Sequence, residues 1–346
     1  LSAYEQIDNY VKECWEAIVD TAVWAEKELP GVLEKVSPDI VCVDNVILFP
    51  AIKRYARENN KPWIRVISCS ENEIPDPQIP PHLSGCGEND SECFSAYQNH
   101  SNEVIQPIHD RFNAFLAECG EAAYPVGEFF EALPHMNLRL YPEPVKFNRS
   151  KPLDSRQFQY LEGCVRDEES FQVPEFKTHN EAPLLYVSFG SLGSGDTGLL
   201  KRLMDVISTM PVRALFNVGD YESEYDVVPD NVQIASWYPQ PSVISQSDAV
   251  IHHGGNNSFN ECLYFGKPAL IMPYVWDGHD NAKRVAETGH GCHLHRNHWK
   301  PKELRATIES MLMNEAMQER LAATSTHMRS EPGPTKAAAI LDQLLS

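Results

Sequence analysis

The sequence predicts an α/β protein built from two doubly wound domains. The chain has 346 residues, more than one ordinary hydrophobic core accommodates. Short apolar runs alternate with helical patterns in both halves, which is typical of parallel sheets covered by helices. A charged segment without periodicity separates the halves. We therefore expect domains over residues 1–165 and 183–330, a linker over 166–182, and a helix over 331–346 that could pack back on the first domain.

The first domain begins with a helical pattern over residues 1–28 rather than with a strand. A helix over 48–60, with Pro50 in its first turn, joins the first two strands into a βαβ unit. The expected strands are the apolar runs at 38–46, 62–70, 136–143 and 158–164. Because a doubly wound domain normally begins with a strand, we expect this domain to lack its front, roughly 60–90 residues at about 30 per unit.

The second domain shows a complete alternating series. Its expected strands are the runs at 184–191, 214–219, 232–237, 248–253, 268–274 and 292–296. Three helical patterns close the chain, at 301–313, 315–329 and 334–345.

Charge and composition narrow the classes of partner. There are 29 Lys and Arg residues against 49 Asp and Glu, a formal charge of −20, which argues against nucleic acid or an anionic membrane. The sequence has no run of the roughly 18 apolar residues that a transmembrane helix needs, and it shows no signal peptide. Nine cysteines are an odd number. Cys42 and Cys262 are expected in the core, Cys86 and Cys93 could pair, and the simplest compartment is the cytoplasm.

The stretch IHHGGNNSFNE, residues 251–261, concentrates polar groups between two apolar elements. Ligands of doubly wound sheets bind beyond the carboxyl ends of the strands. Gly255 would let a ligand approach the backbone, and Asn257 or Ser258 would cap a helix whose free N–H groups attract an anion. Glu261, one turn later, could accept hydrogen bonds from the hydroxyls of a ribose. The simpler alternative is a capped helix with a solvated glutamate.

Three neighbouring turns fit the same interpretation, although each alone could be an ordinary turn. SFGSLGS at 188–194 follows a strand and resembles a phosphate-facing loop. In SWYPQ at 236–240, Trp237 could stack on a flat base. Asp277, in DGHDN, could accept hydrogen bonds from sugar hydroxyls or cap a helix.

The segments WYPQ, HHGGNNSFNECLYFGKPALIMP and DGHDNAKR, in this order over residues 236–281, resemble the donor-binding signature of the UDP-glycosyltransferase family. Macrolide, flavonoid and glucuronyl transferases are members. The resemblance implies the GT-B architecture, in which two Rossmann-like domains face each other across a cleft. The first domain would be the acceptor-binding domain, incomplete at its N-terminus, and the second would bind the UDP-sugar.

The resemblance also implies roles for individual residues. Trp237 would stack on uracil with Gln240 nearby, Glu261 would bind the ribose, and Asp277 would bind the donor sugar. The diphosphate would be held by residues of two turns, namely Ser191, His253, Gly255, Asn257 and Ser258. The family usually has Asp-Gln where this chain has Asp277-Gly278, and His279 is a candidate substitute for the missing amide.

On the acceptor side, Asp44 matches the family's aspartate that orients a catalytic histidine. That histidine belongs to a first strand that the sequence lacks, and the earliest histidine is His82. Acceptor contacts are expected from loops 71–90 and 120–135. Their mixed side chains suit an apolar, hydroxyl-bearing molecule: Ile74, Ile79, His82, Leu83, Tyr124, Phe129 and Phe130.

The sequence therefore predicts an inverting, UDP-dependent hexosyltransferase with UDP-glucose as the first candidate donor and a lipophilic small molecule as the acceptor. No metal and no cofactor are expected, although the four histidines and the cysteine of HGCHLHRNH at 290–298 could also be read as a metal site. Two alternatives stay open: a UDP-sugar-binding protein without catalysis, because the base is missing, and another GT-B enzyme such as a sugar-nucleotide epimerase or a GlcNAc transferase.

Overall fold

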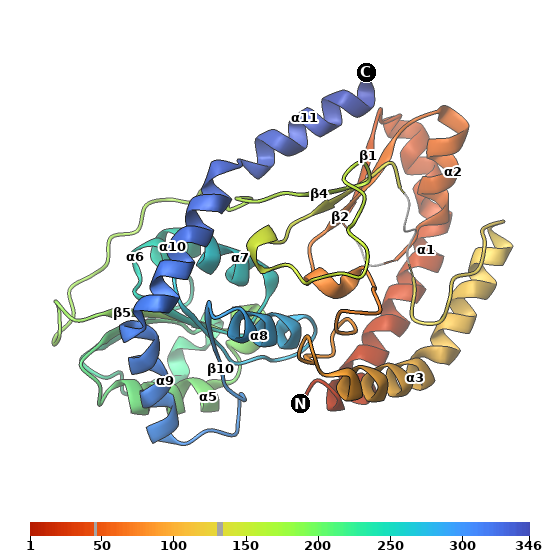
Figure 1. Ribbon diagram of the computed structural model, residues 1–346. Helices are drawn as coiled ribbons and strands as arrows, with labels where there is room; N and C mark the ends of the chain where they lie inside the picture. Colours follow the sequence, from red (N-terminus) through yellow and green to blue (C-terminus); the bar gives the residue numbers. More distant parts are fainter. Residues whose placement is uncertain (45–46, 130–133) are drawn as a thin grey trace. The chain divides into compact units, whose positions relative to one another are not determined.

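The computed structural model describes residues 1–44, 47–129 and 134–346 (Figure 1). Phe130 therefore lies outside the described residues. The chain divides into two compact units. Unit 1 comprises residues 1–162 and 332–346, and unit 2 comprises residues 163–331. Each unit contains a parallel sheet with helices, which confirms the predicted α/β fold class.

Unit 1 is organised around a four-stranded parallel sheet with the order β1-β2-β3-β4. The strands are β1 (Val41–Asp44), β2 (Trp63–Ile67), β3 (Met136–Arg139) and β4 (Phe158–Tyr160). The helices are α1 (Lys12–Val36), α2 (Pro50–Asn59), α3 (Ser91–Glu118) and α11 (Gly333–Leu345). As predicted, Pro50 occupies the first helical position of α2, where its missing N–H would have had no partner in any case.

Helix α11 belongs to unit 1 although it follows all of unit 2 in the chain. Its apolar side chains pack on a buried cluster of β2, β3 and the end of β4, formed by Ile64, Met136, Leu138 and Leu161. The helix contributes Ala337, Ile340, Leu341 and Leu344 to this contact. The spacing of these four residues is that of one helix face, so α11 covers the sheet with a single apolar stripe.

Unit 2 contains a six-stranded parallel sheet with the order β10-β9-β8-β5-β6-β7. The strands are β5 (Leu184–Ser188), β6 (Arg213–Asn217), β7 (Val232–Ala235), β8 (Ala249–His252), β9 (Ala269–Ile271) and β10 (Gly291–His293). Strands β5 and β8 are direct neighbours, yet the chain leaves β5 toward one edge and returns through β8 toward the other. This point of reversal is where open α/β sheets bind ligands.

The helices of unit 2 connect its strands and continue beyond the last one. They are α4 (Gly190–Gly193), α5 (Thr197–Ile207), α6 (Gln240–Gln246), α7 (Asn256–Tyr264), α8 (Gly278–Glu287), α9 (Pro301–Met313) and α10 (Glu315–Ser330). The predicted linker is irregular, as its sequence suggested, but it lies within unit 2. Phe171 fixes it there: its N–H donates to Ser242 Oγ at 2.8 Å, and its ring meets that of Tyr238 edge-on.

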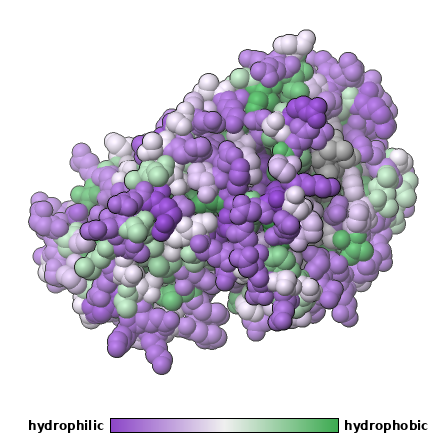
Figure 2. Space-filling model, in the orientation of Figure 1, coloured by the Kyte–Doolittle hydropathy of each residue, from purple (hydrophilic) through white to green (hydrophobic). Residues whose placement is uncertain are grey.

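The cysteines differ in part from expectation. Cys262 is buried as predicted, but Cys42 is exposed because it occupies an outward position of β1, whose only buried side chain is that of Val43. Cys86 and Cys93 form a disulfide, which is more typical of oxidising compartments than of the expected cytoplasm. Within the described residues, no helix is both long and apolar enough to cross a membrane. On the face drawn in Figure 2, hydrophilic side chains predominate and hydrophobic ones are scattered.

Candidate functional site

Two glycine-rich turns follow β5 and β8 at the point of reversal, and His253 lies between them. A Cβ at Gly190 would lie 2.9 Å from His253 Cε1, and a Cβ at Gly255 would lie 2.6 Å from His253 Nε2. Real Cβ contacts are longer than this, so both turns depend on glycine to accommodate the imidazole. The two glycine-containing turns that the sequence shows after separate strands therefore pack around the same histidine.

Gly254 brings a third turn to the same place. Its φ of 93° is strained for any other residue, and a Cβ there would lie 2.7 Å from the carbonyl oxygen of Gly278. Asn281 Nδ2 donates to the Gly254 carbonyl at 2.8 Å and ties the turn to α8. The starts of α7 and α8 are therefore held together at the carboxyl edge of the sheet.

The two histidines at the tip of β8 are both uncharged at neutral pH. Burial lowers the pKa of His252 to about 3 and that of His253 to about 4. His252 Nδ1 accepts a hydrogen bond from the Gly254 N–H at 3.1 Å, so this side chain stabilises the turn. His253 Nδ1 is buried and lacks a hydrogen-bond partner within the described chain. His252 Nε2 is likewise buried without a hydrogen-bond partner within the described chain, but His253 is the histidine that lies between the Gly190 and Gly255 turns.

Helix α7 begins two or three residues earlier than the sequence suggested. Gly255 is the N-cap and Asn256 the first helical residue, so neither Asn257 nor Ser258 caps the helix. The reason is that Gly255 reaches the extended cap conformation, with φ −57° and ψ 143°, and its turn must stay open for His253. Asn257 is exposed and Ser258 is buried in the first turn, where backbone N–H groups have no helical partner.

Glu261 is buried one turn into α7 and is bound by a side chain from α6. Gln240 Nε2 donates to Glu261 Oε2 at 2.6 Å and to Ser258 Oγ at 3.2 Å. Burial raises the pKa of Glu261, and the hydrogen bond from Gln240 and the positive charge of Arg166 oppose the rise. Arg166 Nη2 lies 3.6 Å from Glu261 Oε1. The predicted ribose contact and its neighbour Gln240 are therefore one hydrogen-bonded group.

Trp237 lies on the loop between β7 and α6, directly before this group. Its side chain is 57% exposed, although a tryptophan usually buries most of its surface. Its neighbour Tyr238 is buried against Tyr186 and Phe171. An exposed indole next to a buried tyrosine is suited to stack on a flat ligand.

Asp277 and His279 lie where β9 leads into α8, and both side chains are buried. Asp277 is the N-cap residue of α8 but its side chain makes no capping bond, so the simple cap interpretation is wrong. Burial lowers the pKa of His279 to about 4, and its Nε2 has no hydrogen-bond partner among the described residues. Trp276, just before them, has a φ of 61°, which a bulky residue adopts only when its surroundings enforce it.

Two arginines near these residues were not predicted. Arg166 comes from the charged linker, and Arg296 comes from the histidine-rich segment after β10.

Ser191 of α4 lies exposed on the β5 turn and accepts a hydrogen bond from Ser194 through its carbonyl. Of the histidines in 290–298, His290 is committed to structure, since its two nitrogens lie 2.9 Å from Thr288 and Thr324 hydroxyls.

In unit 1, Asp44 ends β1 and borders a cavity of about 380 Å³. Ser68, which follows β2, donates its hydroxyl to Asp44 Oδ1 at 2.7 Å. Glu73 lines the same cavity and is buried in an ion pair with Arg65. Burial raises the pKa of Glu73, and the Arg65 charge opposes the rise. Asp44 is thus the exposed carboxylate of this cavity and Glu73 the buried one.

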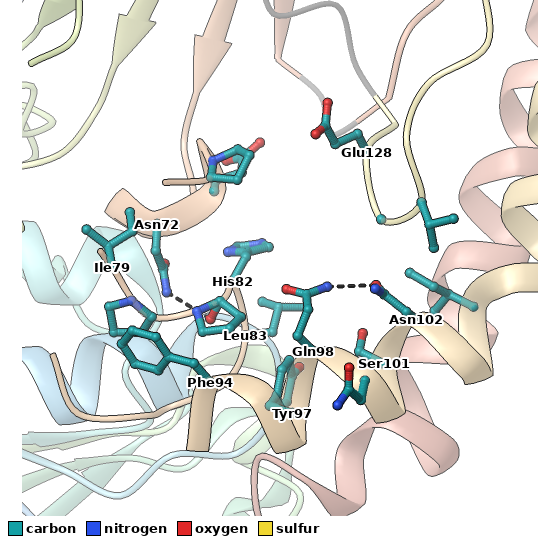
Figure 3. A pocket seen from close by; sticks show the side chains of 18 of the residues that line it. Asn72, Ile79, His82, Leu83, Phe94, Tyr97, Gln98, Ser101, Asn102 and Glu128 are labelled. Carbon is teal, nitrogen blue, oxygen red and sulfur yellow. Dashed lines mark hydrogen bonds between the residues drawn. The ribbon is translucent and has the colours of Figure 1, made fainter. Parts of the chain in front are cut away.

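A larger cavity of about 700 Å³ lies between the segment after β2, α3 and the segment before β3 (Figure 3). Ile79, His82 and Leu83, all in the predicted acceptor loop 71–90, line one side. Polar groups of α3 line the other, where Gln98 Nε2 donates to Asn102 Oδ1 at 2.7 Å. From the second predicted loop, Val126, Gly127 and Glu128 contribute, whereas Tyr124 and Phe129 do not line the cavity.

Buried ion pairs hold the loop that forms this cavity. Arg149 Nε donates to Glu71 Oε1 at 3.0 Å, and its Nη1 donates to the Ile74 carbonyl at 2.8 Å. Arg139 donates to the carbonyl of Glu71 at 2.5 Å. Since each partner is buried and charged, removal of one would leave an uncompensated charge. These contacts anchor the loop where it leaves β2.

Residues 202–344 match the family described as erythromycin biosynthesis protein CIII-like, C-terminal domain. Over this region the chain is similar to antibiotic and UDP-dependent glycosyltransferases. This finding confirms the resemblance that residues 236–281 indicate, and the match includes the turns after β8 and β9.

Individual glycosyltransferases are also similar to this chain in sequence or in structure. The chain is 28% identical over 152 residues to an aclacinomycin-T 2-deoxy-L-fucose transferase of Streptomyces galilaeus, a match that covers 43% of this chain and 34% of that protein. A solved structure of the glycotransferase of kitacinnamycin superposes with a TM-score of 0.77 at 20% identity, covering 100% of this chain and 85% of that one. The spinosyn rhamnosyltransferase SpnG complexed with thymidine diphosphate gives 0.68 at 17% identity, covering 98% and 84%.

The structural likeness to these glycosyltransferases concerns the fold, and it extends over both units. The family match lies in the second half of the chain. The chain spans about a third of the length of the first curated relatives. In this chain, the predicted donor residues cluster at the carboxyl edge of the unit 2 sheet, and Asp44 lies in unit 1.

Proposed function

We propose that this protein transfers a sugar from a nucleoside diphosphate sugar to a hydroxyl of a small-molecule acceptor, with inversion at the anomeric carbon. The observation that carries the proposal is the donor cluster of unit 2. His253 lies between Gly190 and Gly255. Glu261 lies one turn further along α7, where Gln240 of α6 donates a hydrogen bond to it. A diphosphate and a ribose need donors and a carboxylate at this separation.

On this proposal, the diphosphate lies at the N-terminus of α7, where free N–H groups favour negative charge. His253 and the neighbouring Ser191, Asn257 and Ser258 add neutral hydrogen-bond donors, and Gly255 keeps the approach open. The ribose lies against Glu261, with Gln240 beside it, and the base stacks on Trp237. The sugar nucleotide is a co-substrate, and the proposal assigns no metal or cofactor.

The nucleotide is uridine or thymidine diphosphate, and UDP-glucose is our first candidate donor. A carboxylate accepts two hydrogen bonds from a ribose, but only one from a 2′-deoxyribose, so Glu261 favours UDP. The thymidine diphosphate named for SpnG makes the deoxy nucleotide the natural competitor. Asp277 and His279 are the proposed contacts to the sugar hydroxyls, since both are buried at the start of α8.

The larger cavity of unit 1 is the proposed acceptor site. Its volume of about 700 Å³ is in the range of small-molecule pockets. Apolar walls from Ile79 and Leu83 face the amide groups of Gln98 and Asn102, so the acceptor would combine an apolar body with several hydroxyls. Asp44 is the proposed positioning carboxylate for the general base that takes the acceptor proton.

Calorimetry and a turnover assay test the proposal in sequence. Titration with UDP, thymidine diphosphate and UDP-glucose is expected to show binding, with UDP tighter than the deoxy nucleotide. Release of UDP from UDP-glucose is then expected to rise when a hydroxylated aglycone is added. No binding of either nucleotide would overturn the proposal. Binding without acceptor-dependent release would identify a UDP-sugar-binding protein instead.

A further inference from the structure

Arg296 lies after β10, and its guanidinium is buried beside the carboxyl ends of the central strands of unit 2. Its side chain is 6% exposed. Its Cζ lies 4.2 Å from the ring centroid of Tyr274, which follows β9, and 5.4 Å from that of Phe189, which follows β5. Because β8 lies between β9 and β5 in the sheet, the guanidinium is placed at the point of reversal.

Only part of this guanidinium is paired within the protein. Arg296 Nε and Nη2 both donate to Asp196 Oδ2, at 3.1 and 2.9 Å. Arg296 Nη1 is buried and has no hydrogen-bond partner within the described chain. It packs beside α4, where a Cβ on Gly193 would lie 3.7 Å away. An unpaired buried donor destabilises a folded protein, so such groups call for a specific explanation, and a bound ligand is one.

The charge of Arg296 acts on the predicted diphosphate site. It is the second cause, after burial, that lowers the pKa of His253 to about 4. His253 and Gly190 of α4 are in contact, and Arg296 lies against Gly193 of the same turn. The neutral imidazole of His253 could offer a hydrogen bond but no positive charge. A diphosphate at this turn would therefore find its cationic partner in Arg296.

We propose that Arg296 binds the diphosphate of the donor through Nη1 and stabilises it as the leaving group. This inference rests on the proposed function. In the transfer, the acceptor oxygen forms a bond to the anomeric carbon, and the bond from that carbon to the phosphate oxygen breaks. The electron pair of the broken bond stays on the diphosphate, and the acceptor proton goes to the general base. Arg296 stabilises the negative charge that appears on the diphosphate.

Titration calorimetry with UDP and with uridine tests the inference. For Arg296→Gln, we expect the affinity for UDP to fall by about 10- to 100-fold and the affinity for uridine to stay unchanged, because only the phosphates meet the guanidinium. Arg296→Lys is expected to recover part of the loss. The matched control is Arg305→Gln, a cation of the same unit that is bound to Thr209, and it should bind both ligands as the wild type does.

Asp196→Asn separates phosphate binding from a structural ion pair. The amide introduced by this substitution can still cap α5, where Asp196 now accepts from the Leu199 N–H, but it no longer neutralises Arg296. We therefore expect this variant to bind UDP at least as tightly as the wild type. If both Asp196→Asn and Arg296→Gln weaken UDP and uridine equally, the pair is structural and the inference is wrong. If Arg296→Gln leaves UDP affinity unchanged, it is also wrong. If the wild type binds no nucleotide, the proposed function itself fails.

Discussion

Gln240 Nε2 donates to Glu261 Oε2 at 2.6 Å, which joins the start of α6 to the second turn of α7. The bond orients a carboxylate that is only 3% exposed, and it leaves Oε1 facing Arg166. A buried carboxylate held in this way can receive the hydroxyls of a ribose without moving. UDP binding should therefore depend on the ionisation of Glu261, and hence on pH.

Glu261→Gln is expected to weaken UDP binding by about 10- to 100-fold, because the carboxylate accepts two hydrogen bonds that an amide cannot match. Burial raises the pKa of Glu261, and the ionised form is the one that binds. Wild-type affinity should therefore be complete above the raised pKa and fall as the pH drops through it. Glu319→Gln, an exposed change on α10, is the control. Equal affinities of Glu261→Gln and wild type in calorimetry would contradict the ribose role.

Arg166 and Glu168 should move this pH dependence in opposite directions. The positive charge of Arg166 lowers the pKa of Glu261, and the negative charge of Glu168 raises it. As the pH falls, Arg166→Ala is thus expected to lose UDP binding at a higher pH than the wild type does. Glu168→Gln is expected to lose it only at a lower pH. UDP affinity measured across a pH series checks both, and shifts of the same sign would argue against direct charge effects. Lys177→Ala, an exposed change in the same segment, should leave the pH at which UDP binding is lost unchanged.

Gly255→Ala is expected to weaken UDP binding strongly, since its Cβ would lie 2.6 Å from His253 Nε2 and displace the imidazole. Gly198→Ala is the matched control. Its nearest neighbour would be Asp196 Oδ1 at 3.7 Å, and alanine in a helix is favoured over glycine by up to about 1 kcal/mol. Melting temperatures should show both variants folded. A Gly255→Ala protein with wild-type affinity would show that the turn is not part of the site.

Asp44→Ala is expected to lower acceptor-dependent turnover by about 10²- to 10⁴-fold, the usual contribution of assisted proton transfer. UDP affinity should not change, because the donor residues belong to the other unit. Asp39→Ala, an exposed aspartate near the other end of β1, serves as the comparison. Turnover at the wild-type rate in Asp44→Ala would remove this residue from the mechanism.

Acid should destabilise unit 2 through His252. Burial lowers its pKa from 6.5 to about 3, so the unfolded chain binds a proton in this interval that the folded protein does not. Stability is therefore lost as the pH falls through this interval, by up to about 1.4 kcal/mol per pH unit. His252→Asn, whose amide oxygen can accept from the Gly254 N–H, should show a shallower loss in calorimetric unfolding. His327→Asn, at an exposed position, should keep the wild-type slope.

Elements defined by local pattern could be predicted from the sequence, and elements defined by distant contacts could not. The apolar runs at 184–191 and 248–253 contain β5 and β8, and the last three helices begin within one residue of expectation. The start of α7 was misplaced, because cap preference favours Asn257 or Ser258 whereas His253 requires an open turn at Gly255.

Arg296 and Arg166 illustrate what pattern cannot supply. Arg296 is 100 residues from Asp196 in the sequence, and the two meet because the segment after β10 returns to the turn after β5. Arg166 belongs to a segment whose lack of periodicity suggested only a linker. The sequence shows Arg296 only as one arginine among the histidines of residues 290–298. This composition indicates a basic segment, but it does not indicate which other part of the fold the segment contacts.

Because α11 packs on the sheet of unit 1, that unit is assembled from two parts of the chain with all of unit 2 between them. During synthesis on the ribosome, unit 2 emerges as one continuous stretch and can fold as soon as it is released. Unit 1 has to wait, with the apolar surface around Ile64 and Leu138 uncovered, until α11 has left the exit tunnel. Proteolytic removal of α11 would consequently damage unit 1, although α10, the helix before the cut, belongs to unit 2.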